Sequence, residues 1–188
     1  MPMQIRPMVP ADLERLGDID GTIESDRYLH VEREGDGLTV GWRVEERPLR
    51  TPHIARNALS DDLWFRVKQI VSGIEEGLVW VAEHDRALVG LVVAQAVPAE
   101  GVLRIFDLRI DSDFRRQGVG SALLYRVIGE AREKQLRAVM ATTEANNLPA
   151  GRFLLKSGFE LSGLNTRQQS NHDLVKECVT MFWYLAMS

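Results

Sequence analysis

The feature that most constrains this chain is a pair of closely spaced glycines in RRQGVG, residues 115–120, at the start of a helical pattern. The segment before it, FDLRI, has the composition of a strand. The segment after it carries apolar residues at steps of four: Val119, Leu123, Val127 and Ala131. The N-terminus of a helix leaves backbone N–H groups free, and glycine has no side chain that blocks access to them. The pattern therefore predicts a strand–turn–helix unit whose turn can bind a phosphate group.

Two better-known phosphate motifs do not match this segment. A Walker A loop needs a lysine between its last glycine and a Ser/Thr, whereas Gly120 is followed directly by Ser121. A dinucleotide-binding fingerprint needs a third glycine where this chain has Leu123. What remains is R-x-x-G-x-G, in which Arg115 and Arg116 add charged donors. A flexible turn leading into an ordinary helix is the alternative interpretation of the two glycines.

Composition and charge argue against several classes of protein. The 188 residues are 45% hydrophobic and 27% charged, as in an ordinary folded domain, so we expect a single domain over 1–188. A net charge of −4 argues against a nucleic-acid partner. No apolar run approaches the roughly 20 residues of a membrane span, and the first ten residues do not resemble a signal peptide. We therefore expect no membrane association. The lone cysteine, Cys178, predicts a reducing cytoplasm, and the scattered histidines predict no metal site.

Periodicity and turn residues predict the order of the elements. Strands are expected at 3–8, 38–49, 77–83, 87–97, 102–111, 137–144, 159–164 and 178–187, and Pro48 and Pro52 mark the exit from the second of them. Helices are expected at 10–24, at 61–76 after a Ser60 cap, from the glycine turn to about 134, and at 146–158. The segment 25–37 is polar and turn-rich, 84–86 is a tight turn, and 165–177 is a polar loop. This order indicates an α/β (α+β) fold with a mixed sheet and helices on both faces.

Two segments, in this order, resemble the GNAT N-acetyltransferases. RRQGVG looks like the acyl-CoA signature of that family, and NLPAGRFLLKSGF at 147–159 is similar to its Asn-x-x-Ala helix ending in Lys-x-Gly-Phe. The start of that helix and the ending VTMFWYLAM are similar to the streptothricin acetyltransferase branch. The resemblance covers about residues 77–186 and implies a GNAT-like, splayed central sheet. It also implies an acceptor-side part at 1–76, an acyl-CoA-binding core at 77–164, and a loop with the last strand at 165–188.

The resemblance implies acetyl-CoA, which becomes coenzyme A, as a cosubstrate. The pantetheine arm would pair with backbone of the strand at 102–111, and the pyrophosphate would lie on the amides that follow it. The residues implied are Leu108, Arg109, Ile110, Arg115, Arg116, Gln117, Gly118, Val119, Gly120 and Ser121. Asn147 matches the CoA-contacting asparagine of the family, although a helix N-cap is the alternative role. Phe153 would line the cofactor wall or the core.

The implied reaction is attack of a primary amine, in a small molecule or peptide, on the acetyl thioester. An alkylamine has a pKa of about 10, so a base must take its proton. Asp107 and Glu144 lie on the two strands beside the implied gap and are the candidate catalytic carboxylates, although each could be a surface carboxylate. A backbone amide at 108–110 would hold the developing oxyanion. Acidic stretches at 17–26 and 60–62 would suit a cationic amine, or are ordinary solvated loops.

Two positions depart from the family pattern. Leu154 stands where these enzymes often have a tyrosine that protonates the CoA thiolate, and Thr142 stands where the streptothricin branch tends to have glutamate. A thiol with a pKa of about 8.5 leaves fairly well as thiolate, so loss of the acid need not abolish catalysis. The departures keep open a second hypothesis, an acyl-CoA-binding sensor or regulatory module without turnover. Conceivable substitutes for the missing tyrosine are Tyr125, Tyr184, Ser157 and His172.

The aromatic last strand could pair across a homodimer, or end the sheet within one subunit.

Overall fold

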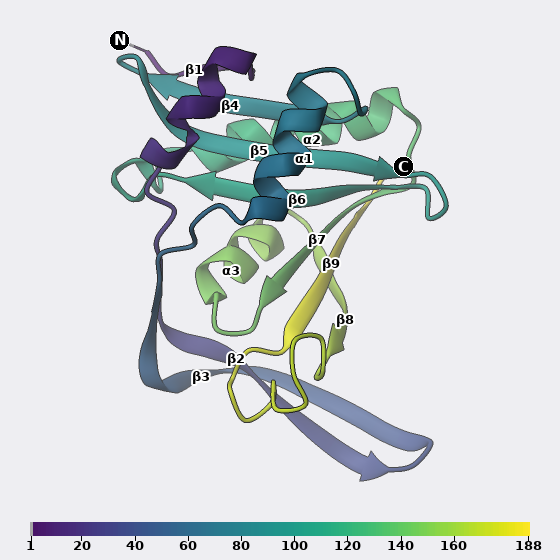
Figure 1. Ribbon diagram of the computed structural model, residues 1–188. Helices are drawn as coiled ribbons and strands as arrows, with labels where there is room; N and C mark the ends of the chain where they lie inside the picture. Colours follow the sequence, from purple (N-terminus) through teal and green to yellow (C-terminus); the bar gives the residue numbers. More distant parts are fainter. Residues whose placement is uncertain (1) are drawn as a thin grey trace. The chain divides into compact units, whose positions relative to one another are not determined.

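The computed structural model of the protein describes residues 2–188 (Figure 1). Its backbone divides into two compact units. The first unit contains residues 2–22, 56–141 and 185–188, and the second unit contains residues 23–55 and 142–184. Two strands, β7 (Ala138–Glu144) and β9 (Thr180–Ala186), run through both units.

Each unit has its own set of further elements. Those of the first unit are β1 (Gln4–Pro7), η1 (Pro10–Asp18), α1 (Asp61–Val71), β4 (Leu78–His84), β5 (Ala87–Val97), β6 (Val102–Ile110), η2 (Ser112–Phe114) and α2 (Val119–Glu133). Those of the second unit are β2 (Ile23–Asp36), β3 (Thr39–Ala55), α3 (Leu148–Lys156) and β8 (Glu160–Asn165). None of the helices within residues 2–188 is both long enough and apolar enough to cross a membrane.

Seven strands form one mixed sheet, as the sequence predicts. Their order is β1-β4-β5-β6-β7-β9-β8. Neighbours from β1 to β6 are antiparallel, β6 and β7 are parallel, and β8 and β9 are antiparallel. The parallel pairing of β6 covers Val102–Arg104, while the strand itself continues to Ile110, so the sheet is splayed as predicted.

The aromatic strand β9 lies inside this sheet, between β7 and β8. It therefore has neighbours on both sides and lacks the open edge that pairing with a second chain would need. The expectation that the last strand could end the sheet was wrong, because β8 is the edge strand on that side.

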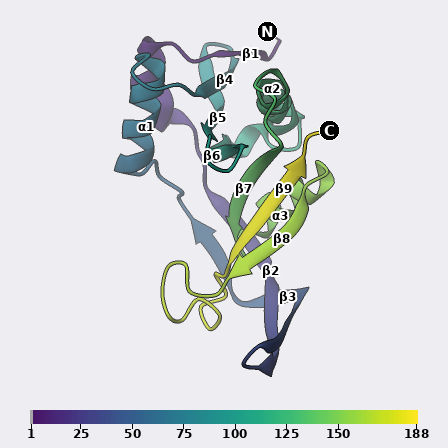
Figure 2. The same ribbon diagram turned by 90° about the vertical axis from the view of Figure 1, so that its right-hand side faces the viewer.

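Helices cover both faces of the strands of the first unit, which confirms the predicted layering (Figure 2). η1 and α1 lie on one face and α2 lies on the other. The cluster under η1 and α1 contains Met8, Leu16, Ile19, Val67, Ile70, Val79, Val81, Leu88, Leu91 and Val93. On the opposite face, the predicted α2 stripe is buried and consists of Val119, Leu123, Val127 and Ala131. Gly90 permits close approach of α2, since an added Cβ would lie 3.1 Å from Leu123 Cδ1.

Local turn and cap chemistry follows the sequence closely. The Leu63 N–H donates to the Ser60 side chain at 3.1 Å, so Ser60 caps α1 as predicted. The hairpin between β4 and β5 turns on Asp85 (φ 49°) and Arg86 (φ 66°). Two successive residues with positive φ are what a two-residue hairpin of type I′ requires.

The segment after η1 departs from the prediction. Residues 25–37, predicted to be polar turns, instead form most of β2, which pairs with β3 in a two-stranded ribbon. Much of this ribbon is exposed, so β2 lacks the apolar alternation that reveals a strand in a sequence. The helix predicted at 10–24 was wrong in type and length: it is a 3-10 helix that ends at Asp18.

β3 also extends further than predicted, through Pro48 and Pro52 to Ala55. Each strand of a two-stranded ribbon has one unpaired edge, where the missing N–H of proline costs no ladder hydrogen bond. The ladder with β2 stops after Pro48 and resumes at His53, so that residues 49–52 lie outside it.

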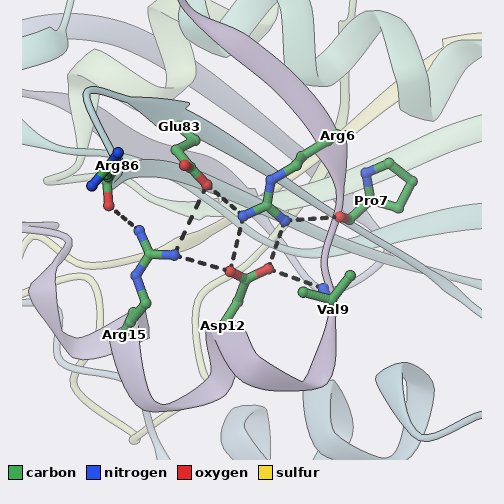
Figure 3. Close-up of polar contacts among 7 residues, drawn as sticks. All are labelled: Arg6, Pro7, Val9, Asp12, Arg15, Glu83 and Arg86. Carbon is green, nitrogen blue, oxygen red and sulfur yellow. Dashed lines mark hydrogen bonds and ion pairs between the residues drawn. The ribbon is translucent and has the colours of Figure 1, made fainter.

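A buried ion-pair cluster fixes η1 to the sheet (Figure 3). Asp12 is 1% exposed and accepts hydrogen bonds from Arg6 Nη1 at 2.7 Å, Arg6 Nη2 at 2.9 Å and the Val9 N–H at 3.0 Å. Arg15 Nη1 lies 3.3 Å from Asp12, and Arg6 Nη2 donates to Glu83 at 2.5 Å. The hydrogen bonds from Arg6 hold the pKa of Asp12 below its usual range.

Candidate active site

The glycine turn that the sequence singled out lies between η2 and α2 in the first unit. Gly118 is the N-cap of α2 with φ 82°, a conformation that favours glycine, and Arg116 also has a positive φ of 60°. No side chain caps the helix, and its first turn contains no acidic residue. The first intrahelical bond here runs from the Ala122 N–H to the Gly118 carbonyl, so the preceding amides stay available. The turn therefore leaves backbone N–H groups free at a helix N-terminus, an arrangement that is typical of anion-binding sites.

The side chains of the turn leave these amides open. Arg115 Nε donates to the Ile110 carbonyl at 3.1 Å, and Gln117 Nε2 donates to the Asp113 carbonyl at 3.2 Å. Both bonds direct the side chains back onto the preceding loop. The Arg116 side chain is exposed, so its charge can reach a bound anion from solvent.

One edge of β6 turns backbone groups away from β5 next to this turn, and of these the Ile110 carbonyl accepts from Arg115. The Asp111 N–H donates to the Val89 carbonyl at 2.8 Å, which fixes the phase of the antiparallel ladder between β5 and β6. Hydrogen-bonded pairs recur at every second residue, so Arg109 bonds toward β5 while Leu108 and Ile110 turn their backbone groups to the other edge. Of the predicted strand residues, Leu108 and Ile110 thus have the required orientation, and the backbone of Arg109 does not.

Asp107 is engaged in a nearly buried ion pair. Arg109 Nε and Nη2 donate to its two carboxylate oxygens at 2.6 and 2.9 Å, and Arg109 Nη1 donates to the Asn57 carbonyl at 2.6 Å. In the pairing of β5 with β6, Phe106 forms a bulge between the paired residues Ile105 and Asp107. This bulge sets the position of Asp107 on the strand. Both carboxylate oxygens of Asp107 therefore already accept a hydrogen bond from the guanidinium.

The other predicted site residues lie in the second unit. Glu144, at the end of β7, accepts one hydrogen bond from Gln169 Nε2 at 2.5 Å. Within residues 2–188, its second carboxylate oxygen has no side-chain partner. Asn147 is the N-cap of α3 and accepts from the Ala150 N–H at 3.4 Å, which is the structural role left open by the sequence. Phe153, on the same helix, is half-buried.

The departure at Leu154 leaves a buried apolar side chain, 4% exposed, where the family often has a tyrosine. Ser157, one conceivable substitute, donates its hydroxyl to the Phe153 carbonyl at 2.7 Å and so closes the end of α3. Tyr125 is 66% exposed on α2. Neither position is prepared to donate a proton inside a site.

No pattern in the sequence points to a polar network between the β2–β3 ribbon and Glu177. The Tyr28 hydroxyl lies 2.6 Å from His30 Nδ1, and Arg50 Nε donates to Glu177 at 2.7 Å. Burial, followed by the negative charge of Glu177, raises the pKa of Tyr28. Tyr28 and His30 lie in the segment 25–37, which the sequence predicts to be polar and turn-rich, so no signal marks them as part of a network.

The remaining reactive groups form no further centre. Burial raises the pKa of the Cys178 thiol, with the Asp173 carboxylate as a second cause, so it is a poor nucleophile. In the part of the chain that the structure describes, residues 2–188, no three His, Cys, Asp or Glu side chains are grouped to hold a metal ion.

Comparisons with known proteins agree with these features. The model of the Acetyltransferase (GNAT) family matches residues 41–159. Streptothricin acetyltransferase A of Bacillus subtilis (strain 168) is 33% identical over 84 residues, 45% of this chain and 48% of that protein. The chain thus spans about half the length of the curated relatives that it matches, or less.

Solved structures match over the whole length. Nourseothricin acetyltransferase has a TM-score of 0.79 at 24% identity, covering 100% of both chains. An acetyltransferase of Bacillus anthracis str. Ames, assigned to streptothricin and solved in complex with acetyl coenzyme A, has a TM-score of 0.75 at 20% identity, covering 99% of this chain and 100% of that one. The resemblance predicted from the two motifs is confirmed. Because the family model matches well over half of the chain, this protein belongs to the GNAT acetyltransferase family.

Proposed function

We propose that this protein is an acetyl-CoA-dependent N-acetyltransferase that acetylates a primary amine of a small molecule or peptide. The observation that carries the proposal is the uncapped N-terminus of α2 at Gly118, next to the free backbone edge of β6 at Leu108. The amides from Gln117 to Ser121 would hold the pyrophosphate, with Arg115 and Arg116 beside them. The backbone of Leu108 and Ile110 would pair with the pantetheine arm.

The chemical step is direct transfer. The amine nitrogen attacks the thioester carbonyl carbon, a C–N bond forms, and the C–S bond breaks to release the coenzyme A thiolate. A backbone N–H on the free edge of β6, at Leu108 or Ile110, would stabilise the oxyanion that develops on the carbonyl. The proton of the amine passes to a carboxylate, directly or through water.

Glu144 fits the role of this base better than Asp107 does. Both oxygens of Asp107 accept from the Arg109 guanidinium, whereas Glu144 has one oxygen without such a partner. Glu144→Gln should lower kcat at least 100-fold at neutral pH. Asp107→Asn should instead reduce stability, because it leaves Arg109 without its charged partner. Reversal of the two phenotypes would assign the base to Asp107.

Binding and turnover can be tested separately. Calorimetry with acetyl-CoA, coenzyme A and ATP should show affinity for the first two and none for ATP. Gly118→Leu should abolish acetyl-CoA binding because a leucine is strained at φ 82° and would force the turn that presents the free amides to change, while Gly129→Leu is the control in the same helix. Unchanged affinity of Gly118→Leu would reject the placement of the cofactor.

A second candidate function is an acyl-CoA-binding module without turnover. The buried Leu154 and the engaged hydroxyl of Ser157 favour it, because neither supplies a proton to the thiolate. A free-thiol assay across an amine panel separates the two functions: thiol release with any amine supports the transferase.

We include a cytoplasmic location in the proposal, supported by Cys178 as the one cysteine of the sequence.

A further inference from the structure

One edge of β3, in the second unit, has no partner strand. β3 pairs only with β2, in a sheet of two strands. The other edge of β2 is engaged at the base of the ribbon, where the Leu29 N–H donates to the Ala145 carbonyl at 3.0 Å. Within residues 2–188, no backbone hydrogen bond from outside the ladder reaches residues 39–48 of β3. A long unpaired edge of this kind can pair with another chain.

The bond from Leu29 also determines which groups β3 presents at this edge. The Leu29 N–H points away from β3, and Leu29 lies opposite Glu46 in a ladder without a register shift from Arg27 to the turn. Opposite residues alternate between hydrogen-bonded and non-hydrogen-bonded pairs. Glu46, Val44 and Trp42 therefore turn their backbone N–H and C=O groups outward.

One face of the ribbon stays apolar beyond the part that α3 covers. At the base, Leu29 Cδ1 lies 3.8 Å from the position of a Cβ added at Gly151 of α3, and Val31 is 5% exposed. The same face continues through Val40 and Trp42, which are 42% and 40% exposed, and the tip of the ribbon extends away from α3 (Figure 1 and Figure 2). A ribbon of two strands is marginally stable in water, whereas more strands with an apolar face are stable. This part of the ribbon would therefore be stabilised by a partner that adds strands to it.

The charges on the other face favour a second copy of this chain as that partner. Arg43 and Glu45 flank Val44 on β3. If two copies of β3 pair antiparallel about a two-fold axis at Val44, Arg43 of each copy lies directly opposite Glu45 of the other. Opposite charges across two strands stabilise a sheet, and like charges destabilise it. On the apolar face, Val44 lies opposite its own copy, and Val31 continues the row in each ribbon.

Neighbouring registers are less favourable. A shift of the axis by one residue places Arg43 opposite Arg43 of the second copy, or Glu45 opposite Glu45. A shift by two residues loses the contacts between Arg43 and Glu45. Within its own chain, Arg43 Nη2 lies 3.2 Å from Glu34, so the new contact would give this guanidinium a carboxylate on each side. The segment is thus self-complementary in one register, as a two-fold interface requires.

We propose that the protein forms a homodimer in which the free edges of two β3 strands pair antiparallel about a two-fold axis at Val44. The two ribbons then form one sheet of four strands. This dimer does not use the aromatic strand β9, which has neighbours on both sides. It also does not depend on the proposed transferase activity.

The mass in solution and two charge reversals test the dimer. Light scattering over a dilution series should show twice the chain mass of 21.2 kDa at high concentration and 21.2 kDa on dilution. Arg43→Glu and Glu45→Arg each place like charges opposite one another at both contacts, so each variant alone should have a dimer Kd raised at least 10-fold. An equal mixture of the two variants restores both contacts between opposite charges and should regain the wild-type Kd within about threefold. Effects of either substitution within its own chain are the same in the mixture, so they cannot produce this recovery.

Cross-linking tests the register in protein that keeps both charges. In a Cys178→Ser background, Val44→Cys places two thiols at the axis on residues about 5.5 Å apart, within the range of a disulfide. Val40→Cys is the matched control on the same strand and face. Its two copies would lie eight residues apart along the strands, or about 26 Å. Oxidation should therefore yield a covalent dimer with Val44→Cys and none with Val40→Cys.

Each contrary outcome would overturn the inference. A mass of 21.2 kDa at every concentration would exclude the dimer. A mixture that associates no more tightly than its components, or single variants that dimerise like the wild type, would exclude the contact between Arg43 and Glu45. Cross-linking at residue 40 but not at residue 44 would exclude the register. All of these results would leave the thiol-release assay of the transferase unaffected.

Discussion

Replacement of Asp12 by asparagine removes the charge at the centre of the ion-pair cluster under η1. Each carboxylate oxygen accepts from two donors: Oδ2 from Arg6 Nη1 and the Val9 N–H, and Oδ1 from Arg6 Nη2 and Arg15 Nη1. An asparagine must therefore point its NH₂ group at two donors in either orientation. The change is isosteric, so it tests the electrostatics of the cluster without creating a cavity.

The expected cost follows from what is left behind. Removing one partner of a buried ion pair costs about 3–5 kcal/mol. Arg6 keeps Glu83 as a second carboxylate, and its side chain is partly exposed, so we expect the lower end, about 3 kcal/mol. With a urea m-value of about 2 kcal/mol/M, the midpoint of unfolding should fall by about 1.5 M.

The loss should depend on pH in a defined direction. The pKa of Asp12 is lowered in the folded protein, so its stabilisation is present above the unfolded pKa of about 3.9 and is lost as pH falls through the folded value. The difference in unfolding free energy between wild type and Asp12→Asn should be constant above about pH 5 and narrow below pH 4.

Urea denaturation monitored by circular dichroism, repeated from pH 3 to pH 8, measures both effects. Asp18→Asn is the matched control, because Asp18 is an exposed carboxylate at the end of the same helix and its loss should change stability by less than about 0.5 kcal/mol. A loss below 1 kcal/mol for Asp12→Asn, or a difference that stays constant down to pH 3, would refute the reasoning.

Three further changes probe local structure. Ser60→Ala removes the α1 cap and should cost about 1 kcal/mol in urea unfolding; no change would mean that the cap is replaced by water. Gly35→Ala places a Cβ 2.1 Å from the Thr39 carbonyl oxygen at φ 78°, so amide exchange in the β2–β3 ribbon should accelerate at least 10-fold, and unchanged protection would contradict that clash. Arg152→Met removes an exposed ion pair with Glu46 and should cost under 1 kcal/mol in the same unfolding assay, whereas a cost above 2 kcal/mol would show that the pair is more than a surface contact.

Some of the fold and the site was predictable because local chemistry determines it. The α2 stripe, the Ser60 cap, and the tight turn at 84–86 each depend on neighbours within a few residues, and the structure confirms all of them. The glycine turn is of the same kind, because the φ of 82° at Gly118 is a conformation that glycine adopts readily and other residues rarely adopt. The orientation of Leu108 and Ile110, by contrast, is set by the ladder between β5 and β6, whose phase the Asp111–Val89 hydrogen bond fixes.

The rest was decided by partners distant in the sequence. Residues 25–37 form a strand because β3 pairs with them, and an exposed ribbon leaves no apolar alternation by which to recognise it. Asp107 was chosen as a base from its position, but its neighbour Arg109 occupies both of its oxygens in the folded protein. The sequence by itself determined which segments are strands and helices where burial is periodic, and where a helix begins at a glycine turn. Tertiary structure decided which charges are neutralised and which remain free, because pairing depends on distances that no local pattern encodes.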